Sequence, residues 1–122
     1  MTKKELKNQY KETKFPMGVF QIKNQVNGKI LLDSSLNMPA KWRRHLTELK
    51  FGSHRNKVLQ QEWKQYGEAN FLYEVVAELE YKSATEDYGK EVAILAELYL
   101  EELMPFGEKG YHKPRRIDTA SD

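Results

Sequence analysis

The pattern of hydrophobic and polar positions predicts two strands near the start of the chain. Gly18–Lys23 and Lys29–Asp33 are short segments rich in large apolar and β-branched residues. Asn27-Gly28 lies between them, and this dipeptide is a strong local signal for a hairpin turn because both residue types accept positive φ angles. The pattern therefore predicts an antiparallel β-hairpin.

Two helices are expected after the hairpin. Asn37 can cap the first helix, Pro39 is tolerated in a first helical turn, and Gly52 marks the end. The second helix is expected over about Asn56–Tyr66, with Gly67 as its stop. Both should pack beside the hairpin, because apolar residues recur at helical spacing at Trp42, Leu46 and Leu49 and again at Leu59, Trp63 and Tyr66.

A third strand and a last helix are expected in the second half of the chain. Phe71–Val76 is apolar on both alternating faces, which is typical of a covered central strand, and Ala77–Glu80 becomes polar on one side. We expect this strand to pair with the hairpin. A polar loop at Lys82–Asp87 precedes the helix, which ends near Pro105 and has apolar residues at Tyr88, Val92, Leu95 and Tyr99.

These elements fit one compact domain, because 122 residues leave little room for a second. We place this domain at residues 17–112. A helical extension is expected over residues 1–16, since Lys3–Thr13 has Leu6 and Tyr10 at i, i+4 among lysines. Residues 113–122 are expected to be a disordered tail.

Composition narrows the classes of protein that fit. Hydrophobic residues make up 39% and charged residues 31% of the chain, as in ordinary globular proteins. The lysine-rich start is not followed by an apolar stretch long enough for a signal peptide, and no segment suits a membrane span, so a cytoplasmic location is expected. The lack of cysteine excludes disulfides and thiolate zinc sites, in agreement with a reducing compartment.

The net charge of +2 conceals an uneven distribution. Residues 1–64 carry 14 Lys/Arg and 5 Asp/Glu, a balance of +9, whereas residues 65–122 carry 6 and 13, a balance of −7. Such a split can mark a nucleic-acid face on the first half, or the two halves can attract one another within the fold. Composition alone does not choose between them.

Several residues, in their order along the chain, resemble the GIY-YIG nuclease family. Gly18-Val19-Phe20 stands at the first name motif and Leu31-Leu32-Asp33 at the second, with the Asn-Gly turn between them. Further landmarks follow as far as His112, namely Ser34-Ser35, Trp42, His45, Gly52-Ser53-His54, Asn56–Gln60, Trp63–Gly67, Phe71, Glu101-Glu102-Leu103 and Gly110-Tyr111. The resemblance implies an α/β (α+β) fold, with a small three-stranded antiparallel sheet that is opened by the β-hairpin and flanked by helices.

The resemblance also implies that most residues used for cleavage are missing. Family members hydrolyse phosphodiesters with a tyrosine in the first motif as general base, a second tyrosine, an arginine on the following helix and a glutamate that holds a divalent metal. Phe20 replaces the first tyrosine, and losing a general base typically costs about 10²–10⁴ in rate. Leu31 replaces the second tyrosine. Asp33 replaces the motif glycine and puts a carboxylate beside the phosphate position, and Lys41 keeps the arginine's charge but not its planar fork.

The position of the metal-binding glutamate depends on the register of the late helix. If Tyr99 is the aromatic residue three positions after it, Ala96 occupies the position, whereas counting back from Gly110-Tyr111 favours Glu97. One residue turns a helical position by about 100°, so Glu97 points away in the first register. No cofactor is expected, and Mg²⁺ or Mn²⁺ is expected only if the protein is catalytically active. His112 replaces the asparagine that usually follows the Gly-Tyr pair.

Other candidate residues have both a structural and a functional interpretation. Lys41, His45 and His54 occupy positions where the resemblance implies a catalytic role, and a histidine beside a core helix is also a common structural residue. His45, His54 and His112 are enough in number for a three-histidine metal site, but their spacing along the sequence does not indicate one. The basic stretch is either a solvated helix face or a nucleic-acid-binding surface. It comprises Lys41, Arg43, Arg44, Lys50, Arg55 and Lys57.

Three classes of function follow from these observations. The favoured one is a non-catalytic module that keeps the nuclease scaffold and binds nucleic acid, with DNA bound weakly and without sequence preference. The first alternative is an active metal-dependent endonuclease with a displaced site, in which Glu97 and Asp33 hold the metal. The second is a protein-interaction domain that uses the acidic late helix and the lysine-rich start. The sequence names no protein partner.

Overall fold

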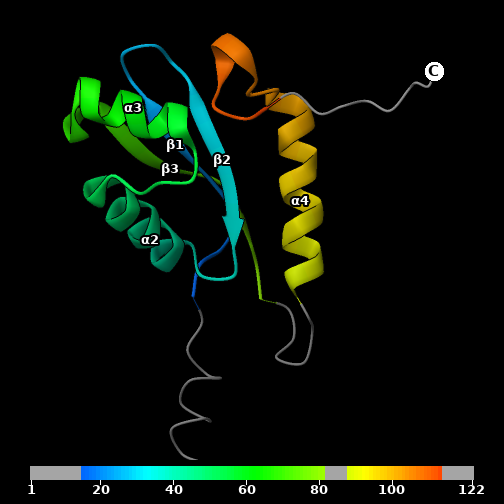
Figure 1. Ribbon diagram of the computed structural model, residues 1–122. Helices are drawn as coiled ribbons and strands as arrows, with labels where there is room; N and C mark the ends of the chain where they lie inside the picture. The colour runs from blue at the N-terminus through cyan, green and yellow to red at the C-terminus, as the bar shows by residue number, and fades with distance from the viewer. Residues whose placement is uncertain (1–14, 82–87, 114–122) are drawn as a thin grey trace, which may run out of the picture.

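The computed structural model describes residues 15–81 and 88–113. The expected N-terminal extension, polar loop and C-terminal tail lie outside these residues. Every strand and helix predicted for the described part is present (Figure 1). The elements are β1 (Met17–Asn24), β2 (Ile30–Ser35), α2 (Met38–Phe51), α3 (Lys57–Tyr66), β3 (Phe71–Leu79) and α4 (Tyr88–Leu103), with single 3₁₀ turns at Glu68–Asn70 and Gly107–Lys109.

The three strands form one antiparallel sheet in the order β2-β1-β3. β1 and β2 make the predicted hairpin, with Phe20 opposite Asp33, and β3 pairs with the other side of β1 as predicted. The prediction that Phe71–Val76 forms a central strand is wrong, because β1 is central and β3 lies at an edge. Leu72 and Val75 are correspondingly 37% and 47% exposed. Apolar residues on both faces of a strand indicate two covered faces, but they do not indicate two paired edges.

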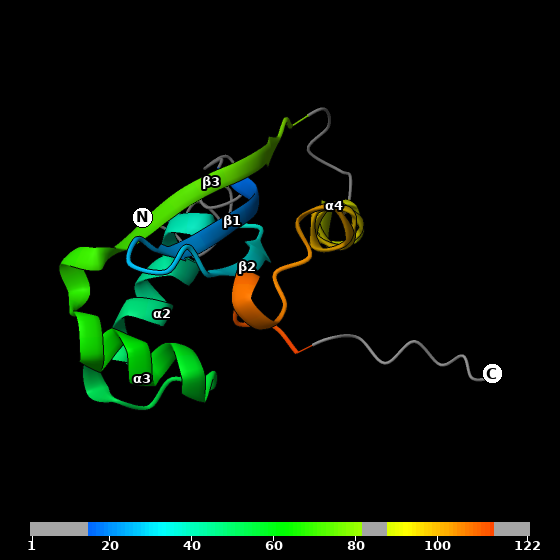
Figure 2. The same cartoon turned by 90° about the horizontal axis from the view of Figure 1, so that it is seen from above.

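Helices cover both faces of the sheet (Figure 2). Successive side chains of a strand point to opposite faces. Phe20 and Ile22 of β1 thus point toward α2 and α3, whereas Met17 points the other way and packs against Tyr88 and Val92 of α4. The larger core lies on the α2 and α3 side and consists of Phe20, Ile22, Leu31, Met38, Leu49, Leu59, Trp63, Phe71 and Tyr111.

The ends of α2 and α3 lie where the sequence predicts them. Asn37 Oδ1 accepts the Ala40 N–H at the start of α2, and Gly52 ends this helix in the left-handed conformation with a φ of 76°. Asn56 Oδ1 accepts the Leu59 N–H at the start of α3. These side chains satisfy backbone donors that a helix leaves unpaired in its first turn.

A network of hydrogen bonds joins the hairpin, α3 and the segment after α4. Tyr111 Oη donates to Glu62 Oε1 at 2.6 Å and accepts from Asn24 Nδ2 at 3.0 Å. The backbone N–H of Tyr111 donates to Ile30 O at 3.0 Å. Asn24 is fully buried, and its polar atoms need such partners because an unpaired buried polar group costs about 1–3 kcal/mol. The C-terminal segment is thus held against β2 and the hairpin.

Gly18 lies where β1 runs too close to β3 for any side chain. Its φ is 151°, and a Cβ atom at this position would collide with the carbonyl oxygen of Ala77. Glycine alone accepts both this backbone conformation and this approach. The glycine of the first motif therefore has a structural role in strand pairing.

Replacing Gly18 by alanine is expected to destabilise the fold more than the same change at Gly28 in the hairpin loop. Gly28 has a φ of 79°, but no atom lies within 4 Å of its Cβ position. Both variants carry roughly 1 kcal/mol of backbone strain, and Gly18→Ala adds about 1–3 kcal/mol of overpacking. Chemical denaturation gives the free energy of unfolding of each variant. Equal losses would contradict the close approach of β1 and β3.

Candidate functional site

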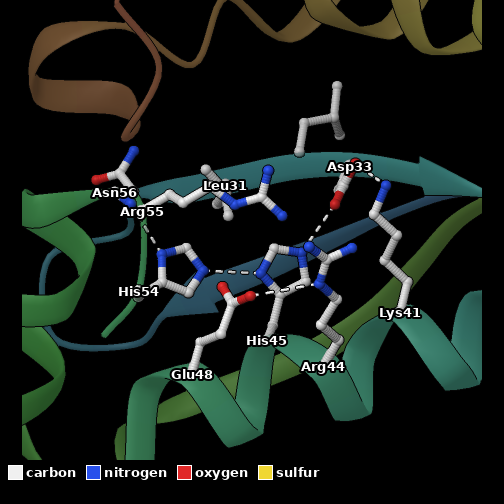
Figure 3. A pocket seen from close by; sticks show the side chains of 10 residues that line it. Leu31, Asp33, Lys41, Arg44, His45, Glu48, His54, Arg55 and Asn56 are labelled. Atoms are coloured by element: carbon white, nitrogen blue, oxygen red, sulfur yellow. Dashed lines mark hydrogen bonds and ion pairs between the residues drawn. The ribbon is translucent and has the colours of Figure 1, made fainter. Parts of the chain in front are cut away.

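A pocket of about 260 Å³ lies between β2, α2 and the loop before α3 (Figure 3). Its walls combine basic side chains, acidic side chains and two histidines. Figure 3 shows Asp33 of β2 pointing toward α2, where His45 and Lys41 lie. The lining residues are Leu31, Leu32, Asp33, Lys41, Arg44, His45, Glu48, His54, Arg55 and Asn56.

Asp33, His45 and His54 form a continuous chain of hydrogen bonds in this pocket. Asp33 Oδ2 lies 2.8 Å from His45 Nε2, and His45 Nδ1 lies 2.8 Å from His54 Nε2. The remaining ring nitrogen, His54 Nδ1, accepts the Asn56 N–H at 3.0 Å. All four nitrogens of the two rings are therefore engaged.

The backbone of Asn56 decides where the protons of this chain lie. Because the Asn56 N–H can only donate, His54 Nδ1 carries no proton, and the neutral ring carries its proton on Nε2. This proton is donated to His45 Nδ1, so His45 carries its own proton on Nε2 and donates it to Asp33. Both rings are neutral in this arrangement and Asp33 is ionised. Neither ring retains a free lone pair.

The environments of His54 and Asp33 favour the same protonation states. Burial lowers the pKa of His54 and so favours its neutral form. Burial opposes ionisation of Asp33, but the hydrogen bonds from His45 and the Ser34 N–H outweigh it, together with the charge of Lys41, and lower the Asp33 pKa. The Ser34 N–H lies 2.8 Å from Asp33 Oδ1, and Lys41 Nζ lies 3.5 Å from the same oxygen.

Carboxylates offset two of the three basic side chains that line the pocket. Lys41 pairs with Asp33 at 3.5 Å, and Arg44 Nε lies 3.3 Å from Glu48 Oε2. Over residues 15–81 and 88–113, no carboxylate forms an ion pair with Arg55. Arg55 therefore contributes the positive charge that a bound anion meets most directly.

The other three residues of the predicted basic stretch lie outside the pocket lining. Arg43 and Lys57 are exposed on α2 and α3. Lys50 is also exposed, and its Nζ lies 3.8 Å from Glu68 Oε2. The stretch thus divides into a pocket half and a surface half.

Two positions where the family has tyrosines lie beside the pocket. Phe20 is fully buried, and its ring meets the edge of His45 with a centroid separation of 5.9 Å. Leu31 is 8% exposed and forms part of the pocket wall. Neither side chain can accept a proton, so this wall of the pocket is apolar.

The candidates on α4 and after it do not line the pocket. Ala96 is half-buried and Glu97 is exposed. His112 is held elsewhere, since its Nε2 accepts the Leu32 N–H at 2.8 Å and burial lowers its pKa. In the part of the chain that the structure describes, no group of three His, Cys, Asp or Glu residues is placed to hold a metal ion. Among the described residues, His45, His54 and His112 are thus not gathered into a three-histidine site.

Sequence reasoning identifies members of this site separately but not their contacts. Asp33 is predicted as a carboxylate beside the phosphate position, and the structure shows that it contacts His45 and Lys41. Glu48 is not predicted at all. The available signal is its place four residues after Arg44 on the same helix, a spacing that brings opposite charges together.

Among the described residues, no helix is long and apolar enough to cross a bilayer. No family model matches the chain. A segment of 65 residues is 31% identical to Intron-associated endonuclease 1 of Enterobacteria phage T4, and it covers 53% of this chain but 26% of that protein.

Two solved structures are similar over most of the described fold. A mutant of the catalytic domain of intron endonuclease I-TevI is 25% identical with a TM-score of 0.64, and the match covers 80% of this chain and 93% of that one. The catalytic domain of homing endonuclease I-TevI is 24% identical with a TM-score of 0.66, covering 81% and 99%. These matches confirm the predicted α+β fold and the family resemblance that the motifs indicate.

Lowering the pH from about 7 to about 5 is expected to reduce the free energy of unfolding. The folded pKa values of His54 and His112 lie below the ordinary value of 6.5, so the unfolded chain takes up protons first. The contribution of the two neutral histidines to the free energy of unfolding is complete above pH 6.5, and it is lost as the pH falls through their lowered folded pKa values. His54→Gln should shrink this loss, as denaturant titrations across the range measure. An unchanged pH dependence in the variant would contradict a buried neutral ring at His54.

Proposed function

We propose, from the premise that this chain is related to the GIY-YIG endonucleases, that it is a nuclease-like domain that binds nucleic acid without cleaving it. The observation that carries the proposal is the pairing of Asp33 with both His45 and Lys41. In the proposal, Asp33 takes the place of the motif glycine and engages two side chains that would otherwise be free to face a phosphate.

The hydrogen bonds in the pocket support the absence of cleavage. A general base needs a free lone pair within hydrogen-bond reach of the attacking water. The nitrogens of His45 are bonded to Asp33 and His54, and the outer nitrogen of His54 is bonded to the Asn56 N–H. Phe20 adds no acceptor. A water molecule in the pocket would therefore find no free histidine nitrogen to remove its proton.

The charges in the pocket support weak binding. A phosphate group has to share Lys41 with Asp33 and Arg44 with Glu48, whereas Arg55 is paired with no carboxylate of the described residues. The exposed basic residues beside the pocket extend the surface along α2 and α3. Contacts of this kind recognise the phosphate backbone and carry no base information, so binding should depend on salt and little on sequence.

Charge substitutions in the pocket test the binding surface. Arg55→Ala should weaken binding to duplex DNA and reduce the slope of log affinity against log salt concentration by about 1. Asp33→Asn should strengthen binding, because it removes a negative charge and releases Lys41. Fluorescence anisotropy with duplex and branched DNA at two salt concentrations measures both effects.

Lys64→Ala is the matched control, since Lys64 is exposed on α3 but does not line the pocket. It should leave the affinity close to that of the unmodified protein. An equal loss in Lys64→Ala and Arg55→Ala would place binding outside the pocket. No binding even at low salt would favour the protein-interaction alternative.

The purified protein is expected not to cleave supercoiled plasmid or branched DNA in the presence of Mg²⁺ or Mn²⁺. Loss of the base costs about 10²–10⁴ in rate, and loss of one charge-stabilising donor costs about 10²–10³. These factors need not multiply, because groups that act together are non-additive, but either one brings turnover close to background. Glu97→Ala is assayed in parallel. Nicking that disappears in this variant would reveal an active site displaced to Glu97.

A further inference from the structure

α4 carries apolar side chains on two opposite sides. Tyr88 and Val92 face the sheet and are 7% and 4% exposed. Ile94 and Leu98 are 55% and 56% exposed. Ile94 lies two residues after Val92, which is a turn of about 200° around the helix axis, so it points away from the sheet. Leu98 lies one helical turn further along the same side.

One acidic residue lies on the same side of α4 as these two apolar residues. Glu101 follows Leu98 by three residues, and it is exposed. We refer to Ile94, Leu98 and Glu101 as the outer face of α4. The whole helix contains four glutamates and one lysine. This combination repels nucleic-acid phosphates and suits a partner segment that offers apolar side chains together with lysines.

We propose that residues 1–14 of the same chain cover the outer face of α4. This segment carries five lysines and two glutamates, so its charge is opposite to that of α4. Its apolar residues Leu6 and Tyr10 are four positions apart, the same spacing as Ile94 and Leu98. The inference concerns a surface separate from the pocket and does not rest on the proposed function.

The start of β1 brings this segment within reach of α4. Tyr81 Oη donates to the carbonyl oxygen of Phe15 at 2.7 Å, and Met17 packs against Tyr88 and Val92 in the first turns of α4. In the proposal, residues 3–10 are helical and rise by about 10 Å, as do residues 94–101 of α4. Residues 11–14, extended, span up to about 13 Å, which exceeds the diameter of about 10 Å of a helix. The segment is therefore long enough to pass around the helix and run along its outer face.

A segment that departs near the first turn of α4 runs antiparallel to that helix. In this direction one register satisfies both the apolar and the charged positions, since each set is spaced by four and then three residues. The facing pairs are Tyr10 with Ile94, Leu6 with Leu98 and Lys3 with Glu101. A second copy of α4 would bring glutamates against glutamates, and this repulsion favours the chain's own basic segment as the occupant.

Disulfide trapping in the full-length chain tests this register. The chain has no cysteine, so Lys3→Cys with Glu101→Cys introduces a single pair of thiols and leaves both apolar pairs intact. A disulfide forms only when the Cβ atoms approach to about 4.5 Å or less. Losing the Lys3 to Glu101 pair should cost little, because an exposed ion pair contributes weakly. Mild oxidation should convert the protein to an internally bridged monomer, seen on a non-reducing gel.

The control combines Lys3→Cys with Gln61→Cys, which places the second thiol at an exposed position of α3 beyond the other face of the sheet. It should not form the bridge under the same conditions. Adding Leu98→Asp to the first pair should slow bridging by about tenfold, because it removes one apolar contact. The proposal would be overturned if the Gln61→Cys control bridges equally, if Leu98→Asp does not slow bridging, or if no bridge forms at all. Dimers linked between two copies would also overturn it.

Discussion

The burial of β1 on both faces imposes the arrangement of the other elements. Phe20 and Ile22 need a covering layer on one side of the sheet, and Met17 and Val19 need one on the other, and all four side chains are fully buried. Because β1 also pairs along both edges, neither β2 nor β3 can be the central strand. α2 and α3 supply the first layer and α4 supplies the second. Each fully buried apolar side chain of this size contributes about 1.5–3 kcal/mol, so the two layers are strongly coupled to one strand.

The same strand register determines the chemistry of the pocket. Asp33 pairs across the sheet with Phe20, so both side chains point to the side of α2. A carboxylate in this half-buried position needs compensating partners, and His45 and Lys41 supply them. The arrangement stabilises the pocket, and in the proposed function it also occupies groups that a substrate phosphate would use. In the proposed function, the substitution at the motif glycine thus accounts for both a stable fold and a loss of cleavage.

Ion pairs between the basic half and the acidic half of the chain are few among the described residues. Among the described residues, Lys50 with Glu68 is the ion pair that joins residues 1–64 to residues 65–122. The basic pocket residues lie on α2 and in the loop before α3, whereas α4, with four glutamates and one lysine, lies across the sheet. This separation favours distinct partners for the two surfaces, and the proposed contact with residues 1–14 adds a second link between the halves.

The sequence by itself determined the type of each described element, the ends of α2 and α3, and the family resemblance. The signals for these features, such as the caps at Asn37 and Asn56 and the stop at Gly52, act within a few neighbouring residues. It also identified His45 and His54 as candidates. Only the tertiary structure decided that β3 is an edge strand, that the basic stretch divides at the pocket, and that Asp33 joins the two histidines. Strand order and hydrogen-bond direction depend on contacts between segments distant in the chain, which a local pattern does not specify.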